Sequence, residues 1–191
     1  MLVQSIISLT MSTTNKNIIN IKTRLVKFCD KFSLISSNQF GFQQNKSTCD
    51  ALVNLTENIY SALNNRSHHY AIMVDLRKAF DVVNHEILLK KLEFYGFRGV
   101  PLEWFRSYLS NRQSFVQFGK VKSSMNTVNI GVPQGSILGP ILFILYVNNI
   151  TNLSPNMSMT LFADDTSISI SNHDFDDLVV STNLELDKLH N

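Results

Sequence analysis

Residues 157–170 have the sequence MSMTLFADDTSISI, in which apolar and polar side chains alternate on either side of two aspartates. Alternation with a period of two is typical of a β-strand that buries one of its faces. Because only Asp164 and Asp165 separate the two alternating stretches, the segment predicts a β-hairpin with an acidic tip. Taken alone, such a tip is most simply a turn exposed to water.

A third aspartate follows another apolar stretch. Residues 70–74 are rich in strand-forming side chains, and Asp75 comes directly after them. Carboxylates gathered at strand ends repel one another unless water or a cation compensates their charge. If this strand lies beside the hairpin, Asp75, Asp164 and Asp165 converge where two divalent cations, which prefer oxygen ligands, can bind. Spacing in the sequence alone leaves that pairing open.

The segment GVPQGS at residues 131–136 precedes the most apolar stretch of the chain. A glycine beside a helix start lets the backbone approach a ligand closely, and a helix N-terminus favours phosphate groups. The segment therefore suits a nucleotide contact. Taken alone, a tight turn from a strand into a helix explains it at least as well.

Helical spacing of apolar side chains, together with capping residues, predicts six helices. They cover residues 18–32, 47–63, 84–96, 101–109, 136–147 and 172–189. In the second helix the predicted buried face consists of Leu52, Leu55, Ile59 and Leu63.

Two further strands are predicted at residues 114–118 and 121–132, around a turn at Gly119-Lys120. With the strands described above, they indicate one α+β domain in which helices cover one face of an antiparallel sheet.

The composition of the 191 residues excludes a disordered or collagen-like chain, because 44% are hydrophobic and 17% are charged. The formal net charge of +2 permits a nucleic-acid partner but does not argue for one. Cys29 and Cys49 are interpreted as ordinary thiols of a reducing compartment.

No membrane segment or secretion signal is predicted. Residues 1–11 lack a basic start and a cleavage site, and the apolar run at 137–147 is shorter than the about 20 residues that span a bilayer. We therefore expect an intracellular protein, in the nucleus, the cytoplasm or both, that is not secreted and has no membrane partner.

Four segments, in order along the chain, resemble motifs of reverse transcriptases from non-LTR retrotransposons. They are SNQFGF with Ser47-Thr48 at 37–48, VDLRKAFDVVNH at 74–85, GVPQGSILGP at 131–140 and FADD at 162–165. The linking residues 96–99 and 104–112 resemble the jockey-type branch of that family. The resemblance covers residues 21–191 and implies a right-hand polymerase palm with partial fingers, whereas residues 1–20 stay poorly defined.

The resemblance implies an RNA-directed DNA polymerase that transfers deoxynucleotides to a primer 3′-hydroxyl. Its partners would be an RNA template, a DNA primer and deoxynucleoside triphosphates. Asp75 and Asp164 would be the principal ligands of two Mg²⁺ ions, for which Mn²⁺ can substitute, and Asp165 the supporting acid.

The resemblance also implies four nucleotide-binding residues. Phe80 would lie beneath the incoming sugar, where its ring would clash with a 2′-hydroxyl; without the motif it is most simply a core residue. Gln134 and Gly135 would contact the incoming nucleotide and its template base, and Lys46 would contact phosphate. Exclusion of ribonucleotides by Phe80 disfavours the alternative of an RNA-dependent RNA polymerase.

The sequence departs from the family pattern at several positions. Gln43 stands where the family has an arginine, which removes a bidentate phosphate donor. Ile7-Ser8-Leu9 is the one trace of an upstream family segment, and the chain ends at Asn191, before the expected thumb and primer-grip hairpin. The alternative interpretation is therefore a catalytically inactive, truncated remnant that at most binds nucleic acid.

Overall fold

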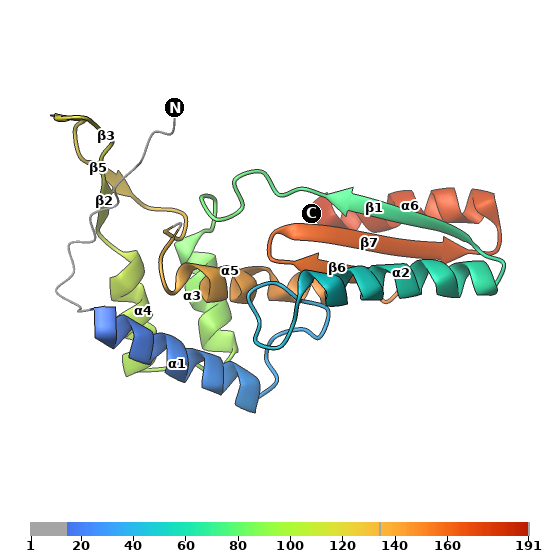
Figure 1. The fold of residues 1–191 in the computed structure, drawn as a ribbon, viewed down its shortest axis with the longest axis horizontal. Helices are drawn as coiled ribbons and strands as arrows, with labels where there is room; N and C mark the ends of the chain where they lie inside the picture. The colour runs from blue at the N-terminus through green and yellow to red at the C-terminus, as the bar shows by residue number, and fades with distance from the viewer. Residues whose placement is uncertain (1–14, 134, 191) are drawn as a thin grey trace. The chain divides into compact units, whose positions relative to one another are not determined.

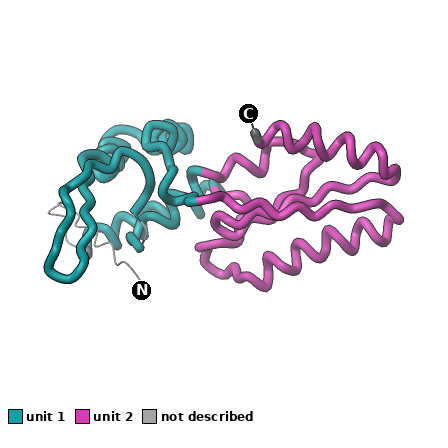
Figure 2. The backbone as a smooth tube through the Cα atoms, turned by 90° about the horizontal axis from the view of Figure 1, so that it is seen from above, with its two compact units in different colours: residues 1–34, 78–146 teal, residues 35–77, 147–191 magenta. Residues whose placement is uncertain are grey.

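A computed structural model describes residues 15–133 and 135–190. The remnant segment Ile7-Ser8-Leu9 and the predicted nucleotide contact Gln134 lie outside the described residues. The chain forms two compact units, each built from two separate stretches of sequence (Figure 2). Unit 1 contains residues 1–34 and 78–146, and unit 2 contains residues 35–77 and 147–191.

Unit 2 is organised around a three-stranded antiparallel sheet (Figure 1). Its strands are β1 (His68–Val74), β6 (Ser158–Phe162) and β7 (Asp165–Asn172), in the order β1-β7-β6. The hairpin predicted from alternation is confirmed as β6 and β7, and β1 is the neighbour of β7. The pairing that the sequence left open is therefore present.

Helices α2 (Thr48–Asn64) and α6 (Phe175–His190) cover opposite faces of this sheet (Figure 1). Met159 packs with Leu178 of α6 in the apolar core, whereas the next residue, Thr160, donates a hydrogen bond to Asn54 of α2 at 2.7 Å. Successive strand residues point to opposite faces, so the two helices lie on different sides. The prediction of helices on one face only is wrong, because the serines and threonines between the apolar strand residues make a second face that a polar helix surface can cover.

The predicted burial of α2 is also wrong in detail. Leu52 and Leu63 are both 61% exposed, and the buried residues of the helix are Ala51 and Ala62. The helix packs small and polar side chains against a polar face of the sheet. The spacing of its leucines therefore does not show which side of the helix is buried. The predicted start is confirmed, since Ser47 and Asp50 form a reciprocal capping box.

Unit 1 is mainly helical. It contains α1 (Asn15–Lys31), α3 (His85–Phe94), α4 (Val100–Leu109) and α5 (Gly139–Val147). The last residue of α5 already belongs to unit 2, and the 3₁₀-helix η1 (Asn148–Asn152) that follows lies in unit 2. Two short ladders pair β2 (Arg112–Ser114) with β5 (Asn126–Val128) and β3 (Gln117–Phe118) with β4 (Val121–Lys122). The turn at Gly119-Lys120 is confirmed, although its strands are shorter than predicted.

These helices and strands confirm the predicted α+β class. Within the described residues, no helix combines the length and the apolar character that crossing a membrane requires.

Candidate active site

The three aspartates lie at one end of the sheet of unit 2. Val74 is the last residue of β1 and pairs with Thr166 of β7. Continuing that register by one residue sets Asp75 opposite Asp165, and Asp164 precedes Asp165 in the turn. Asp75 and Asp165 are exposed and Asp164 is half-buried. Strand pairing thus brings together residues that are 89 positions apart in the sequence, Asp75 and Asp164.

The backbone register sets the three aspartates at one strand end, but their side chains are not gathered into a metal-binding group. Among the described residues, no group of three or more His, Cys, Asp or Glu side chains is arranged to hold a metal ion. Like charges favour rotamers that keep carboxylates apart when no cation is bound. The oxygen-only donor set nevertheless suits a hard divalent cation, which retains waters and binds through one or two carboxylates.

The hairpin turn is shifted by one residue from its predicted position. Phe162 pairs with Asp165, so the turn consists of Ala163 and Asp164 rather than the two aspartates, and Asp165 begins β7. Ala163 has a φ of 59°. This left-handed conformation costs a non-glycine residue roughly 1–2 kcal/mol, so neighbouring contacts must hold the turn.

A residue that the sequence analysis missed makes those contacts. Gln39 is buried, and its side-chain Oε1 accepts a hydrogen bond from the Ala163 nitrogen at 3.0 Å. Its Nε2 donates to the Ala163 carbonyl at 3.4 Å. The neighbouring sequence gives no sign that Gln39 is buried. The one clue is Gly41, two positions later, because a glycine permits a close approach of two backbones.

Lys46 bonds to the same segment. Its ammonium donates to the carbonyls of Ser37 at 2.6 Å and Gln39 at 2.7 Å, and lies 4.8 Å from the centre of the Phe40 ring. Partial burial lowers the pKa of Lys46, and the nearby Asp50 carboxylate partly offsets that shift. In this structure Lys46 stabilises the Gln39 segment; its contact with phosphate stays a prediction.

In unit 1 the start of the GVPQGS motif, Gly131 and Val132, lies against the stretch that carries Phe80. The Val132 nitrogen donates to the Phe80 carbonyl and the Gly131 nitrogen to the Val83 carbonyl, both at 2.8 Å. A Cβ on Gly131 would stand 2.7 Å from the Asp81 oxygen, so this position requires glycine. Gly135 is exposed, with a φ of 75°.

Two further residues that the sequence analysis missed fix this motif. The Gly131 carbonyl accepts a hydrogen bond from Arg112 Nη1 at 3.0 Å and contacts His85 Nε2 at 2.8 Å. Arg112 is buried, and this burial lowers its pKa. The Phe80 ring is half-buried and stacks on Phe143 of α5, with the ring centres 4.4 Å apart.

Charge is divided unevenly between the units. Unit 1 contains thirteen lysines and arginines against five aspartates and glutamates, whereas unit 2 contains four against ten. The net charge of +2 therefore conceals a basic unit and an acidic one. A basic surface attracts polyanions such as nucleic acid, and an acidic strand end attracts cations.

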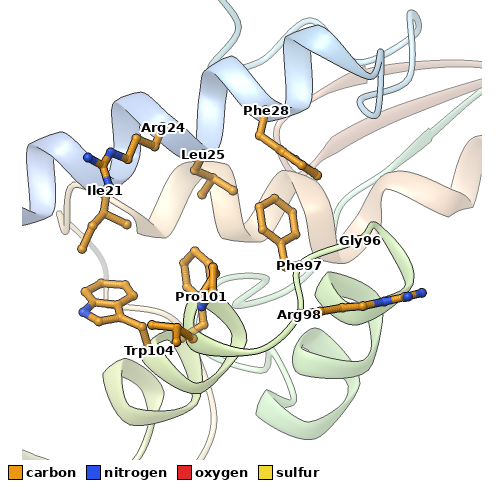
Figure 3. Close-up of a pocket in the computed structure, with 11 residues that line it drawn as sticks. Ile21, Arg24, Leu25, Phe28, Gly96, Phe97, Arg98, Pro101 and Trp104 are labelled. Carbon is orange, nitrogen blue, oxygen red and sulfur yellow. The ribbon is translucent and has the colours of Figure 1, made fainter.

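Unit 1 also contains an apolar cavity of about 430 Å³, partly open to solvent, between α1 and α4 (Figure 3). Phe28, Phe97 and Trp104 line it, and the guanidinium-bearing Arg24 and Arg98 border it. None of the described lining residues is a carboxylate, histidine or cysteine. The cavity is therefore unsuited to divalent metal chemistry and is distinct from the aspartates of unit 2.

Comparisons with known proteins identify the family of this chain. Residues 3–186 match the family model described as reverse transcriptase (RNA-dependent DNA polymerase). Over 156 residues, 78% of this chain, it is 31% identical to the probable RNA-directed DNA polymerase from transposon X-element of Drosophila melanogaster. It is 29% identical over 158 residues to the RNA-directed DNA polymerase from mobile element jockey of the same organism.

The chain spans 17% of the length of each of these two relatives. A Pol polyprotein from the type-1 retrotransposable element R2 of Popillia japonica is 26% identical over 120 residues, 61% of this chain and 19% of the relative. The chain belongs to the reverse transcriptase family and is of the kind found in non-LTR retrotransposons.

Proposed function

We propose that this chain carries the catalytic carboxylates of an RNA-directed DNA polymerase, with the sheet of unit 2 as its palm. The observation that carries the proposal is the pairing of Val74 with Thr166, which brings Asp75 to the same strand end as Asp164 and Asp165. Three carboxylates at one strand end supply the oxygen ligands that Mg²⁺ prefers, so the arrangement favours a metal-dependent reaction.

Asp75 and Asp164 would hold two Mg²⁺ ions, with Asp165 in support. Once bound, the ions would lower the pKa of the primer 3′-hydroxyl and neutralise the incoming triphosphate and the leaving pyrophosphate. The residues of the chain supply position and charge rather than covalent chemistry. The primer oxygen attacks the α-phosphorus of the deoxynucleotide, and the bond to pyrophosphate breaks.

The segments around Phe80 and Gly135 would select the nucleotide. Stacking on Phe143 restrains the Phe80 ring, which supports a role in excluding a 2′-hydroxyl. Arg112 and His85 fix the carbonyl of Gly131 and thereby the backbone at the start of this motif. The excess of basic residues in unit 1 supports binding of the template and primer.

Primer extension by the full chain tests the proposal. The assay combines an RNA template, a DNA primer, deoxynucleotides and Mg²⁺, with Asp164→Ala as the matched control. Extension by the wild-type chain that Asp164→Ala abolishes supports the polymerase. Equal signals from the two chains would contradict the polymerase proposal and favour the alternative of an inactive remnant that at most binds nucleic acid.

A further inference from the structure

We propose that Gln39 is a positioning residue that fixes the Ala163-Asp164 turn and thereby sets the affinity of the three aspartates for divalent cations. The inference rests on the proposed function, because it concerns the same metal site. It adds a residue outside the aspartates and specifies what that residue does.

The amide of Gln39 holds both polar backbone groups of Ala163. Its Oε1 accepts from the Ala163 nitrogen at 3.0 Å and from the Gly41 nitrogen at 2.8 Å, while its Nε2 donates to the Ala163 carbonyl at 3.4 Å. The amide side chain offers an acceptor oxygen and a donor nitrogen side by side, which matches the nitrogen and the carbonyl of one residue. With 1% of its surface exposed, Gln39 makes these bonds away from competing water.

The backbone around Gln39 is itself fixed to the hairpin. Phe40 donates to the Leu161 carbonyl at 2.8 Å, and Leu161 donates to the Asn38 carbonyl at 2.9 Å, so the segment runs parallel to β6 as an extra bridge. The carbonyl of Gln39 accepts from Lys46 at 2.7 Å and from Gln43 at 3.1 Å. The amide therefore acts from a rigid base, which preorganised sites require.

The turn needs this support for two reasons. Ala163 occupies the left-handed region without being a glycine, so it persists only where its surroundings hold it. Asp164 and Asp165 also carry like charges at a hairpin tip, which favours their separation. A fixed turn lowers the cost of gathering the carboxylates around a cation; groups that hydrogen-bond to metal ligands themselves typically contribute about 10–100-fold to metal affinity, and we expect the lower end of that range for a contact to the backbone beside Asp164.

The test compares the full chain with Gln39→Met, which keeps the length of the side chain but removes all three bonds. Hydrogen exchange of the Ala163 amide measures the turn directly, and Mn²⁺ titration followed by electron paramagnetic resonance measures the site. We expect faster exchange at Ala163 and a Mn²⁺ dissociation constant raised about tenfold. Unchanged exchange or an unchanged dissociation constant overturns the inference.

Two matched variants separate positioning from general stability. Gln117→Ala alters a glutamine of unit 1 whose amide donates to the Gly119 carbonyl, and Thr160→Val removes the bond from β6 to Asn54. Both should leave Mn²⁺ affinity within about twofold, although Thr160→Val lowers the unfolding temperature. A weakening by Thr160→Val as large as that by Gln39→Met would assign Gln39 a merely structural role.

The two proposals fail in distinguishable ways. If the wild-type chain binds Mn²⁺ no better than Asp164→Asn, the metal site and with it the proposed function fail, as does the link from Gln39 to metal affinity. If Mn²⁺ binding depends on Asp164 but not on Gln39, the proposed function stands and the positioning role is wrong.

Discussion

Gly41 lies so close to Ala163 that a Cβ atom on the glycine would stand 2.2 Å from the Ala163 nitrogen. No side chain, however small, fits between the Gln39 segment and the acidic turn. The contact is between two backbones, so neither partner can yield by changing a rotamer. The strand end that carries the aspartates is thus shaped by a position that has no side chain of its own.

Gly41→Ala should therefore destabilise unit 2 by about 3 kcal/mol, because the backbone of the hairpin or of the Gln39 segment must shift. Urea unfolding measures the change. The matched control is Gly119→Ala, whose Cβ would meet no atom within 4 Å. Its stability should fall only because alanine disfavours a φ of 59°, by about 1 kcal/mol. Equal losses in the two variants would show that the close approach to Ala163 is absent in solution.

Asp75→Asn should abolish primer extension and leave the fold intact. The substitution removes one of three neighbouring negative charges, so the repulsion among them falls in the metal-free protein. We expect the thermal midpoint at low salt to stay the same or to rise, since salt screens this repulsion. A large fall in the midpoint would mean that Asp75 has a structural partner rather than a place in the metal site.

Phe80→Ala should relax the discrimination against ribonucleotides if the ring lies beneath the incoming sugar. The loss of stacking on Phe143 should also cost about 2 kcal/mol of stability, less than for a fully buried phenylalanine because Phe80 is half-buried. Single-nucleotide incorporation with matched deoxy- and ribonucleotides measures the selectivity. Phe94→Ala, at a ring that is 86% exposed in the same unit, should change neither quantity.

Local patterns predicted the parts of the fold that depend on neighbouring residues. Alternation around Asp164 located the hairpin, and Ser47 located the start of α2, because both signals act within a few positions. The covered face of α2 was predicted wrongly, since leucine spacing marks a buried face only when the opposing surface is apolar. Here that surface is a row of serines and threonines, which becomes known only with the strand pairing.

In the candidate site, too, the sequence predicted some residues and missed others. The motifs identified the three aspartates, but only the sheet shows that Asp75 lies at their strand end. Gln39, Arg112 and His85 act through hydrogen bonds to backbone groups that are 19 to 124 positions away. Contacts between a side chain and a distant backbone leave no periodic trace in the sequence, so no local signal predicts them.

The two cysteines should differ sharply in their reaction with a thiol reagent at pH 8. Burial, with a further contribution from Asp30, raises the pKa of the Cys29 thiol to about 12, whereas Cys49 is exposed at the start of α2. The reactive form is the thiolate, so Cys29 should remain unmodified in the folded chain. Absorbance with a disulfide reagent should show one fast thiol, which Cys49→Ser removes, and a second only in urea. Two fast thiols in the folded chain would contradict this assignment.

Stability of unit 2 at low pH should depend on Glu185 of α6. This carboxylate is 4% exposed, accepts from Lys188 at 2.7 Å and from Asn156 at 3.0 Å, and these bonds lower its pKa from 4.5 to about 2. Because the folded-state pKa is the lower one, its stabilising contribution is complete above about pH 4.5.

That contribution should then be lost as the pH falls from about 4.5 towards 2. Thermal midpoints across this range should therefore fall more steeply for the wild-type chain than for Glu185→Gln, which cannot be protonated. Glu57→Gln on the exposed surface of α2 is the matched control and should follow the wild-type curve. Parallel curves for the wild type and Glu185→Gln would mean that the bonds to Lys188 and Asn156 contribute nothing to the pH dependence of folding.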